Sequence, residues 1–129
     1  MNYHQRKQVF LNRLNKWNKK IYIAKKIGVT DDGYEDAIYD RPKEYLMNVQ
    51  PISSEADIAE FGGMAKQMQK AVVEYNKYFG KFNEFDIAYL DGATPKGEEI
   101  NGQNANYKIH PPRNQNKCIV IYFERMSNK

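Results

Sequence analysis

Cysteine and histidine are scarce in this chain of 129 residues, which holds one cysteine, Cys118, and two histidines, His4 and His110. A single cysteine cannot form an internal disulfide, so nothing marks the chain for an oxidising compartment. Neither histidine has a cysteine or histidine at the spacing of zinc ligands. Cys118 opens an apolar stretch, which predicts a buried and unreactive thiol. These absences argue against a zinc site and against a thiol enzyme.

Long apolar runs are also missing. No stretch approaches the roughly 18 apolar residues of a membrane helix, and the basic N-terminus lacks the apolar segment of a secretory signal. We therefore expect a soluble protein, made in the cytoplasm, that does not contact a membrane. Apolar residues make up 41% of the chain, but aromatic residues are plentiful, with ten tyrosines and six phenylalanines. This composition suits a modest core with surfaces that partners cover.

Acidic residues are absent from residues 1–27, which carry eight basic residues, whereas the rest of the chain holds the other 12 basic and all 16 acidic residues. The charge predicts a basic N-terminal arm at 1–16 ahead of a domain at 17–129. Such an arm is a solvated tail, or it binds an acidic protein surface or nucleic acid. The candidate partner or DNA contacts in this region are Arg13, Lys16, Trp17, Lys19, Lys20, Lys25 and Lys26. Trp17 with Tyr22 could stack on single-stranded bases, although both also fit a strand or helix pattern.

Several local patterns predict secondary structure in the first half of the chain. Apolar spacing predicts an amphipathic helix at 5–16. The pair Asp32-Gly33 predicts the turn of a β-hairpin at 19–39. Alternation predicts a strand at 44–50 that a proline ends, with Tyr45, Met47 and Val49 on one face. A serine cap, followed by acidic residues and closed by a glycine pair, predicts a short helix within 53–62.

The second half reads mostly as strands. Residues 64–79 fit either a strand near 67–76 or a helix. The other expected strands span residues 85–90, 106–111 and 118–125, with a long exposed loop at 91–104 and a turn at 113–116. Short strands with turn signals between them are typical of a small, mainly β barrel or sandwich, here with one short helix.

Acidic side chains offer no convincing acid–base pair. Glu98 and Glu99 lie in the loop 91–104, and a loop rich in glycine and asparagine cannot by itself hold carboxylates for catalysis, so we expect them to contact a partner. Glu84 and Asp86 flank a strand start and are interpreted as turn and solvent residues. We therefore expect no catalytic residue, no metal, no cofactor and no enzymatic activity.

The order of these segments resembles a known family. The segments are IYIAKKIG, a DDG turn, IYDRPKEYLMNVQP, SSEADIAEFG, FNEFDIAYLDG and ANYKIHPPRNQNKCIVIYFER. Together, over residues 17–126, they resemble the head-closure proteins (head–tail connectors, or stoppers) of long-tailed siphophages. The resemblance implies a β-barrel made in the host bacterial cytoplasm that forms a homo-oligomeric ring, a dodecamer or hexamer, in the virion neck. The ring would lie between the portal or adaptor and the tail-terminator or tail-tube protein, retain packaged DNA and dock the tail. The arm before Trp17 has no counterpart in the family pattern.

Physical reasoning agrees with a ring, because a ring needs head-to-tail contacts that close by rotation. The loop 91–104 is longer than an ordinary connection and would point into the channel or at the next ring. The helix within 53–62 would cover the open end of the barrel and bury Ile58 and Phe61. Two alternatives stay open: another neck ring, such as a helical adaptor or a tail-completion protein, and a basic nucleic-acid-binding module.

Overall fold

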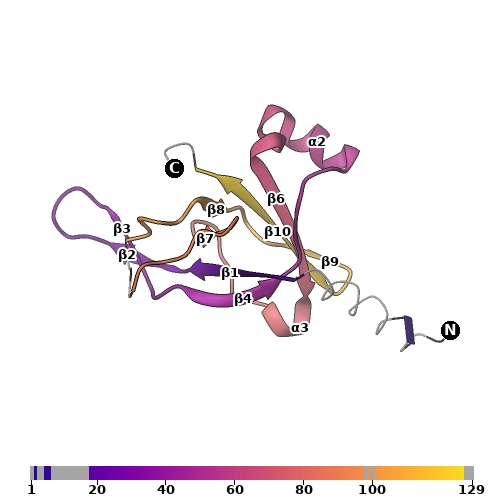
Figure 1. Ribbon diagram of the computed structural model, residues 1–129, viewed down its shortest axis with the longest axis horizontal. Coiled ribbons are helices and arrows are strands. Elements are labelled where there is room, and N and C mark those ends of the chain that lie inside the picture. Colours follow the sequence, from indigo (N-terminus) through magenta and orange to yellow (C-terminus); the bar gives the residue numbers. More distant parts are fainter. Residues whose placement is uncertain (1, 3–4, 7–17, 98, 100, 127–129) are drawn as a thin grey trace.

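The computed structural model describes residues 2, 5–6, 18–97, 99 and 101–126, and most of these belong to a mainly β domain (Figure 1). The strands are β1 (Lys19–Ala24), β2 (Lys26–Val29), β3 (Ala37–Tyr39), β4 (Lys43–Met47), β5 (Val49–Pro51), β6 (Met68–Glu74), β7 (Ile87–Tyr89), β8 (Tyr107–Ile109), β9 (Arg113–Gln115) and β10 (Cys118–Arg125). The helical segments are α2 (Glu55–Phe61), the 3-10 helix η1 (Gly62–Gln67) and the short α3 (Tyr75–Tyr78). The predicted mainly β class is confirmed. The arm at 1–16 and its predicted helix lie almost wholly outside the described residues.

The main sheet curls into a nearly closed barrel. Its strands follow the order β4-β1-β7-β8-β10-β6-β5, and β9 pairs with β10. The strands β4 and β5 lie at the two ends of this order, yet Asn48 alone separates them in the chain. The segment 43–51 therefore runs from one edge of the sheet to the other and holds the two edges near each other. Pro51 is the last residue of β5, as expected of a residue that cannot donate to a ladder.

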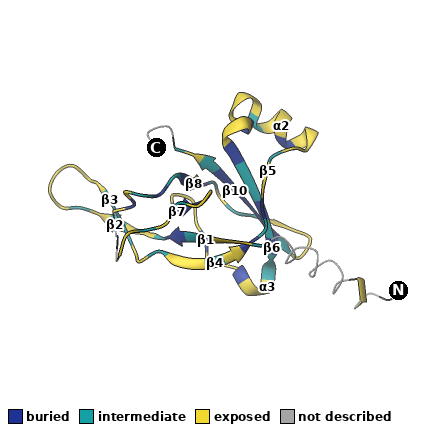
Figure 2. Cartoon of the chain, viewed as in Figure 1, coloured by how far each residue is buried: buried dark blue, intermediate teal, exposed yellow. Residues whose placement is uncertain are grey.

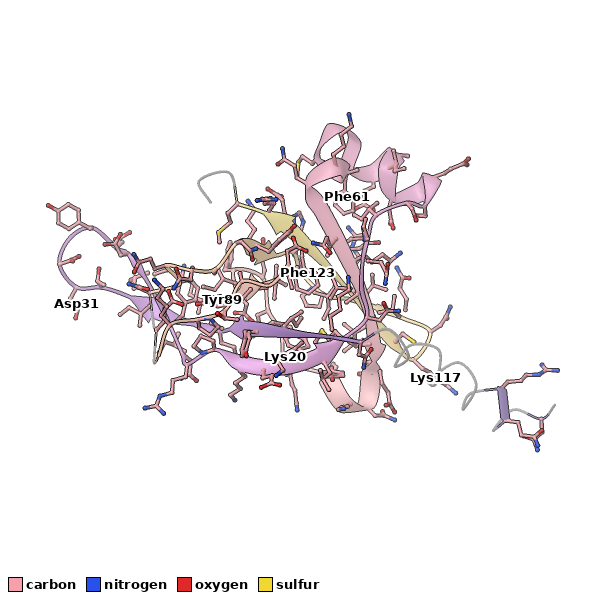
Figure 3. The ribbon with its side chains drawn as sticks, viewed as in Figure 1. Lys20, Asp31, Phe61, Tyr89, Lys117 and Phe123 are labelled. Carbon is pink, nitrogen blue, oxygen red and sulfur yellow. The ribbon has the colours of Figure 1, made fainter. Side chains whose placement is uncertain are left out.

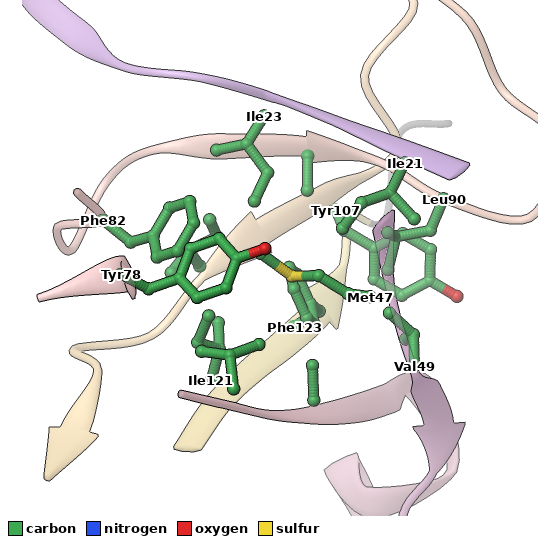
Figure 4. Packing of buried hydrophobic residues seen from close by; sticks show 14 of the residues in the cluster. Ile21, Ile23, Met47, Val49, Tyr78, Phe82, Leu90, Tyr107, Ile121 and Phe123 are labelled. Atoms are coloured by element: carbon green, nitrogen blue, oxygen red, sulfur yellow. The ribbon is translucent and has the colours of Figure 1, made fainter. Parts of the chain in front are cut away.

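The barrel interior is filled by side chains that alternate along the strands. Met47 and Val49 are buried in it, as their predicted common face requires. In β10 the inward residues are Ile119, Ile121 and Phe123, and Figure 4 shows the last two packed among the aromatic rings of the core. Because side chains alternate along a strand, Val120 and Tyr122 of β10 point to the outer face of the barrel.

The outer face of β10 is covered as well. Val120 and Tyr122 form a second cluster with Met68, and Phe61 packs against it from the end of α2. The strand is therefore buried on both faces over most of its length (Figure 2), which explains its near-continuous apolar sequence.

A third cluster lies beneath the loop 91–104. It joins Ile87 and Tyr89 of β7 to Ala24 and Ala105. Gly102 is buried in this region at a φ of 67°, and a Cβ added there would lie 2.4 Å from the Ile87 side chain. The loop was predicted to be long and exposed, but part of it covers the barrel wall.

The predicted hairpin at 19–39 is smaller than expected. Only β2 and β3 pair with each other, whereas β1 pairs with β4 and β7 inside the main sheet. The reason is burial: the apolar residues of β1 are covered by the barrel, while β2 is largely exposed. The turn is also wider than two residues, because the Thr30 amide bonds to the Asp36 carbonyl across the tip.

Two other predictions are resolved. The segment 67–76 is mostly strand, as β6, with η1 before it and α3 after it, so the helical alternative for the whole of 64–79 is wrong. The turn predicted at 113–116 is wrong in position, since residues 113–115 form β9. The turn lies at Asn116 and Lys117, which both take a positive φ, as the two central residues of a type I′ hairpin turn do.

Candidate interaction surfaces

The basic residues expected to contact a partner do not form one patch in the described part of the chain. Lys19 and Lys20 begin β1, and Lys25 and Lys26 follow its end. At roughly 3.3 Å per strand residue, the two pairs lie about 20 Å apart. The Lys20 ammonium lies 3.5 Å from a carboxylate oxygen of Glu44, which partly offsets its charge. Arg13, Lys16, Trp17 and Glu98 lie outside the described residues.

Glu99 holds the loop 91–104 against the barrel. Its Oε2 accepts a hydrogen bond from the Tyr89 hydroxyl at 2.7 Å, and its Oε1 accepts one from the Asn104 amide at 2.7 Å. Burial of the Tyr89 ring, together with this carboxylate, raises the pKa of the Tyr89 hydroxyl. The carboxylate of Glu99 is thus engaged within the chain.

The helix α2 lies on the barrel in a different way from the one predicted. Its cap is Ser54, whose hydroxyl accepts the Asp57 amide at 3.2 Å, and its end is Gly62 at a φ of 58°, both as the pattern indicated. Phe61 is half-buried against the second cluster (Figure 3). Ile58, however, is 47% exposed, so the expectation that the helix buries it is wrong. The buried residue of the helix is Asp57 instead.

Asp57 joins α2 to two strands of the barrel. Its Oδ1 accepts a hydrogen bond from the Tyr122 hydroxyl of β10 at 2.7 Å. Its Oδ2 accepts one from the Lys70 ammonium of β6 at 3.0 Å. A buried carboxylate is tolerated when it is paired and hydrogen-bonded in this way. The helix is therefore fixed by a polar contact at its first turn and by an aromatic contact at its last residue.

A second ion pair fixes the far end of α2. Arg113 of β9 donates to both carboxylate oxygens of Glu60, with the Nη1–Oε1 distance 2.8 Å. Its guanidinium also lies over the Phe61 and Tyr122 rings, 5.7 and 4.8 Å from their centroids. His110 packs its ring edge-on against Phe61. Side chains from α2, β9 and β10 thus form one continuous cluster.

The pKa directions in this cluster follow from its contacts. Burial opposes ionisation of Asp57, but the bonds from Tyr122, Lys70 and Ser54 outweigh it, so the pKa of Asp57 lies below its usual value. Burial first, and then the bond to Asp57, raise the pKa of the Tyr122 hydroxyl to about 12. At neutral pH the carboxylate of Asp57 is therefore ionised, and it accepts hydrogen bonds from the neutral Tyr122 hydroxyl and the Lys70 ammonium.

Asp86 corrects another expectation. It was interpreted as a turn and solvent residue, but it is 2% exposed. Its carboxylate accepts the backbone amides of Lys26 at 3.1 Å and Asn83 at 2.9 Å, while burial raises its pKa. The residue before it, Phe85, has a φ of 78° and is 62% exposed. Asp86 thus ties the base of the hairpin to the start of β7, and the Lys26 ammonium lies 5.5 Å from the centroid of the Phe85 ring.

Most of the exposed large apolar side chains among the described residues lie on two elements that project from the barrel, and the others are Leu46, Phe79 and Phe85. The β2–β3 hairpin presents Ile27, Val29 and Tyr34, the last of which is 81% exposed. The α2–η1 segment presents Ile58 and Met64. Figure 2 shows the hairpin exposed along its loop and α2 exposed on the side away from the sheet. We name these two elements the hairpin (26–39) and the helical flap (55–67).

The described residues offer little that resembles a reaction centre. No group of three or more metal-ligating side chains occurs among them, and no buried polar side-chain atom there lacks a hydrogen-bond partner. Cys118 is half-buried, and burial raises the pKa of its thiol. A groove of about 190 Å³ beside β5 and β6 is lined by uncharged polar side chains, by Pro51 and Val72, and by Asp57 and Lys70, which already bond to each other. None of the helices within the described ranges has the length and hydrophobicity of a membrane span.

Sequence reasoning missed the partners of α2. Asp57 resembled an ordinary acidic residue of a first helical turn, and Arg113 was placed in a turn. The one available signal was Tyr122, a polar-tipped residue within an apolar strand, since a buried tyrosine hydroxyl usually finds a partner. Comparisons with protein-family models, with curated proteins and with solved structures find no match for this chain. The family resemblance of the ordered segments therefore stays a prediction.

Proposed function

We propose that this protein is a structural component of a phage neck, where copies of the barrel form a head-closure ring between the portal or adaptor and the tail. The observation that carries the proposal is a nearly closed barrel with two separate projections, the hairpin and the helical flap, that present apolar side chains to solvent. Exposed apolar side chains grouped on projecting elements are typical of protein–protein contacts. The ordered segments over 17–126 supply the neck context.

The acidic side chains are hydrogen-bonded within the chain, which supports a role in assembly over a role in catalysis. Asp57, Asp86 and Glu99 each bond to neighbouring groups of the chain that also hold structural elements together. A general base needs a reachable proton and a free face. These carboxylates instead dock a helix, a hairpin base and a loop.

The alternatives receive less support. A helical adaptor is disfavoured by the mainly β fold. A basic nucleic-acid module would gain from one continuous cationic surface, whereas Lys19–Lys20 and Lys25–Lys26 lie at opposite ends of β1. A tail-completion protein would also form a ring in the neck. The particles made by a null mutant distinguish it from a head-closure protein, as described next.

A null allele tests the proposal in the phage or prophage that encodes the chain. Electron microscopy of the lysate should reveal heads without tails beside complete free tails, and DNA should leak from the heads. Complementation with the wild-type gene is the control. Complete virions in normal yield would refute a neck role, whereas missing or malformed tails beside DNA-retaining heads would favour a tail-completion protein.

The nucleic-acid alternative has a separate readout. It predicts DNA affinity that falls steeply with salt. Because β1 lies within residues 1–27, the test keeps the full chain and replaces the basic residues of 1–27 by glutamine, which should abolish this affinity. If the null particles were normal and this affinity were strong, the alternative would replace the proposal.

A further inference from the structure

The hairpin is a projecting two-stranded sheet with an unpartnered apolar surface. Among the described residues, β2 pairs only with β3, so the outer edges of both strands are open. Ile27 and Val29 both lie on β2, where they are 63% and 45% exposed, and a register shift between Lys26 and Gly28 interrupts the regular alternation at Ile27. An exposed strand edge beside exposed apolar side chains is a site for pairing with another chain.

The tip of the hairpin carries a concentrated negative charge. Its loop, residues 30–36, contains four acidic residues and no basic one: Asp31, Asp32, Glu35 and Asp36. Hydrogen bonds from the Thr30 hydroxyl and the Tyr34 amide lower the pKa of Asp32, which keeps it ionised. The charge at the base of the hairpin is mixed, with Lys26, Asp40 and Arg41 there, so the unbalanced negative charge lies at the tip.

The other end of the described domain carries the opposite charge. Lys77 lies in α3, Lys81 follows it, and the Lys117 carbonyl accepts the amide of Tyr75, the first residue of α3, at 3.2 Å. The three lysines therefore surround α3, with Glu74 as an acidic neighbour. Figure 3 places Asp31 and Lys117 at opposite ends of the described domain.

This basic end also presents an apolar side chain. Phe79 directly follows α3 and is 61% exposed, with its ring 4.8 Å from the Tyr75 ring. We name the surface made by residues 75–81 and 117 the α3 surface. It matches the hairpin in kind, since each combines exposed apolar or aromatic groups with charge, and the charges are opposite in sign.

We infer that the hairpin of one copy of this chain docks on the α3 surface of the next copy. Because the two surfaces lie at opposite ends of the domain, the contact is head-to-tail and uses a different surface on each copy. A contact of this kind propagates from copy to copy and closes into a ring when the rotation between copies allows it. The inference names the self-contact of the proposed ring, and in that sense it rests on the proposed function.

Cross-linking of the full chain tests this contact. In a Cys118→Ser background, Val29→Cys marks the hairpin and Asn76→Cys marks the α3 surface, and a bifunctional maleimide joins nearby thiols. The variant with both cysteines should give a ladder of dimer, trimer and larger species. Each single variant should stay monomeric, and a mixture of the two single variants should stop at a heterodimer. Thermal melting of each variant confirms that it is folded.

Charge reversal supplies the second arm. Asp31→Lys with Asp36→Lys should reduce the ladder about tenfold, since exposed charge pairs are worth roughly 0.2–1 kcal/mol each and reversal turns attraction into repulsion. Adding Lys77→Glu with Lys81→Glu in the same chain should restore it. The matched control, Glu55→Lys with Ser53→Lys and Gln67→Lys, makes the same change in net charge at exposed positions on and beside the helical flap, away from both surfaces, and should leave the ladder intact.

Dimers from the Val29→Cys variant alone would overturn the inference, because they require hairpin-to-hairpin contact. No ladder at any concentration up to the solubility limit, or a ladder that charge reversal leaves unchanged, would also overturn it. These failures differ from failure of the proposed function. If the cross-linked ladder forms but the null allele gives normal virions, the contact between copies stands and the neck role is refuted. If the null allele gives tailless particles but no ladder forms, the neck role stands and the contact is refuted.

Discussion

Replacing Asp57 by alanine should loosen the helical flap from the barrel. The substitution removes the acceptor of the Tyr122 hydroxyl, which is buried, and of the Lys70 ammonium. A buried hydroxyl left without a partner costs about 1–3 kcal/mol, and hydrogen bonds to a charged group contribute about 1.5–3 kcal/mol. The Lys70 side chain is 31% exposed and can regain water, so the low end applies to it. We expect Asp57→Ala to reduce the free energy of unfolding by about 3 kcal/mol.

Thermal unfolding followed by far-UV circular dichroism measures this effect. For a domain of this size, about 3 kcal/mol corresponds to a fall in Tm of roughly 10 °C. The control is Glu55→Ala, an exposed acidic residue of the same helical turn, which should change stability by at most about 0.5 kcal/mol. Adding Tyr122→Phe to Asp57→Ala should recover about 1 kcal/mol, because the unpaired hydroxyl is then removed.

The same comparison has a defined pH dependence. The pKa of Asp57 is lower in the folded protein than its ordinary value of 3.8, so its contribution is complete above the unfolded pKa and is lost as the pH falls through the folded pKa. The stability gap between wild type and Asp57→Ala should therefore be constant from neutral pH down to about 5 and shrink below about 4. A neutral-pH gap no larger than that of Glu55→Ala would refute the account of α2 docking.

Three further perturbations have definite expected outcomes. Ile119→Asp should abolish the cooperative melting transition by placing a charge in the barrel interior, whereas Lys108→Asp on an exposed position of β8 should leave the transition present. Gly102→Ala should lower the free energy of unfolding by about 1–3 kcal/mol, because the new Cβ would clash with the Ile87 side chain and alanine disfavours a positive φ. Urea titration measures this change, and an unchanged midpoint would show that the loop moves to accept the Cβ without loss of stability. Removal of residues 1–16 should leave the Tm unchanged, since the strands begin at Lys19, and loss of the transition would assign the arm a role in folding.

Local patterns in the sequence were enough for much of the fold. Alternation and apolar content predicted β10 and the common face of Met47 and Val49, and the serine and glycine signals predicted both ends of α2. These features depend on neighbouring residues alone. They also sufficed to predict the mainly β class, because the fold class depends on which kinds of secondary structure occur and not on which strands pair.

The parts that failed depend on residues far apart in the chain. The apolar run of β1 suits either a hairpin or the interior of a sheet, and only its pairing with β4 and β7 decides between them. Asp57 is buried because Tyr122, 65 residues away, and Lys70 meet it. The turn at Asn116 and Lys117 was missed because lysine at a positive φ has no sequence signature.

The most direct measurement of the central claim is an electron cryomicroscopy reconstruction of the neck in particles made by the phage that encodes this chain. We expect a ring between portal and tail whose repeating density fits the nearly closed barrel, with the hairpin of each copy against the α3 surface of the next. Particles whose neck density has no place for this barrel, and from which the polypeptide is absent by mass spectrometry, would contradict the account.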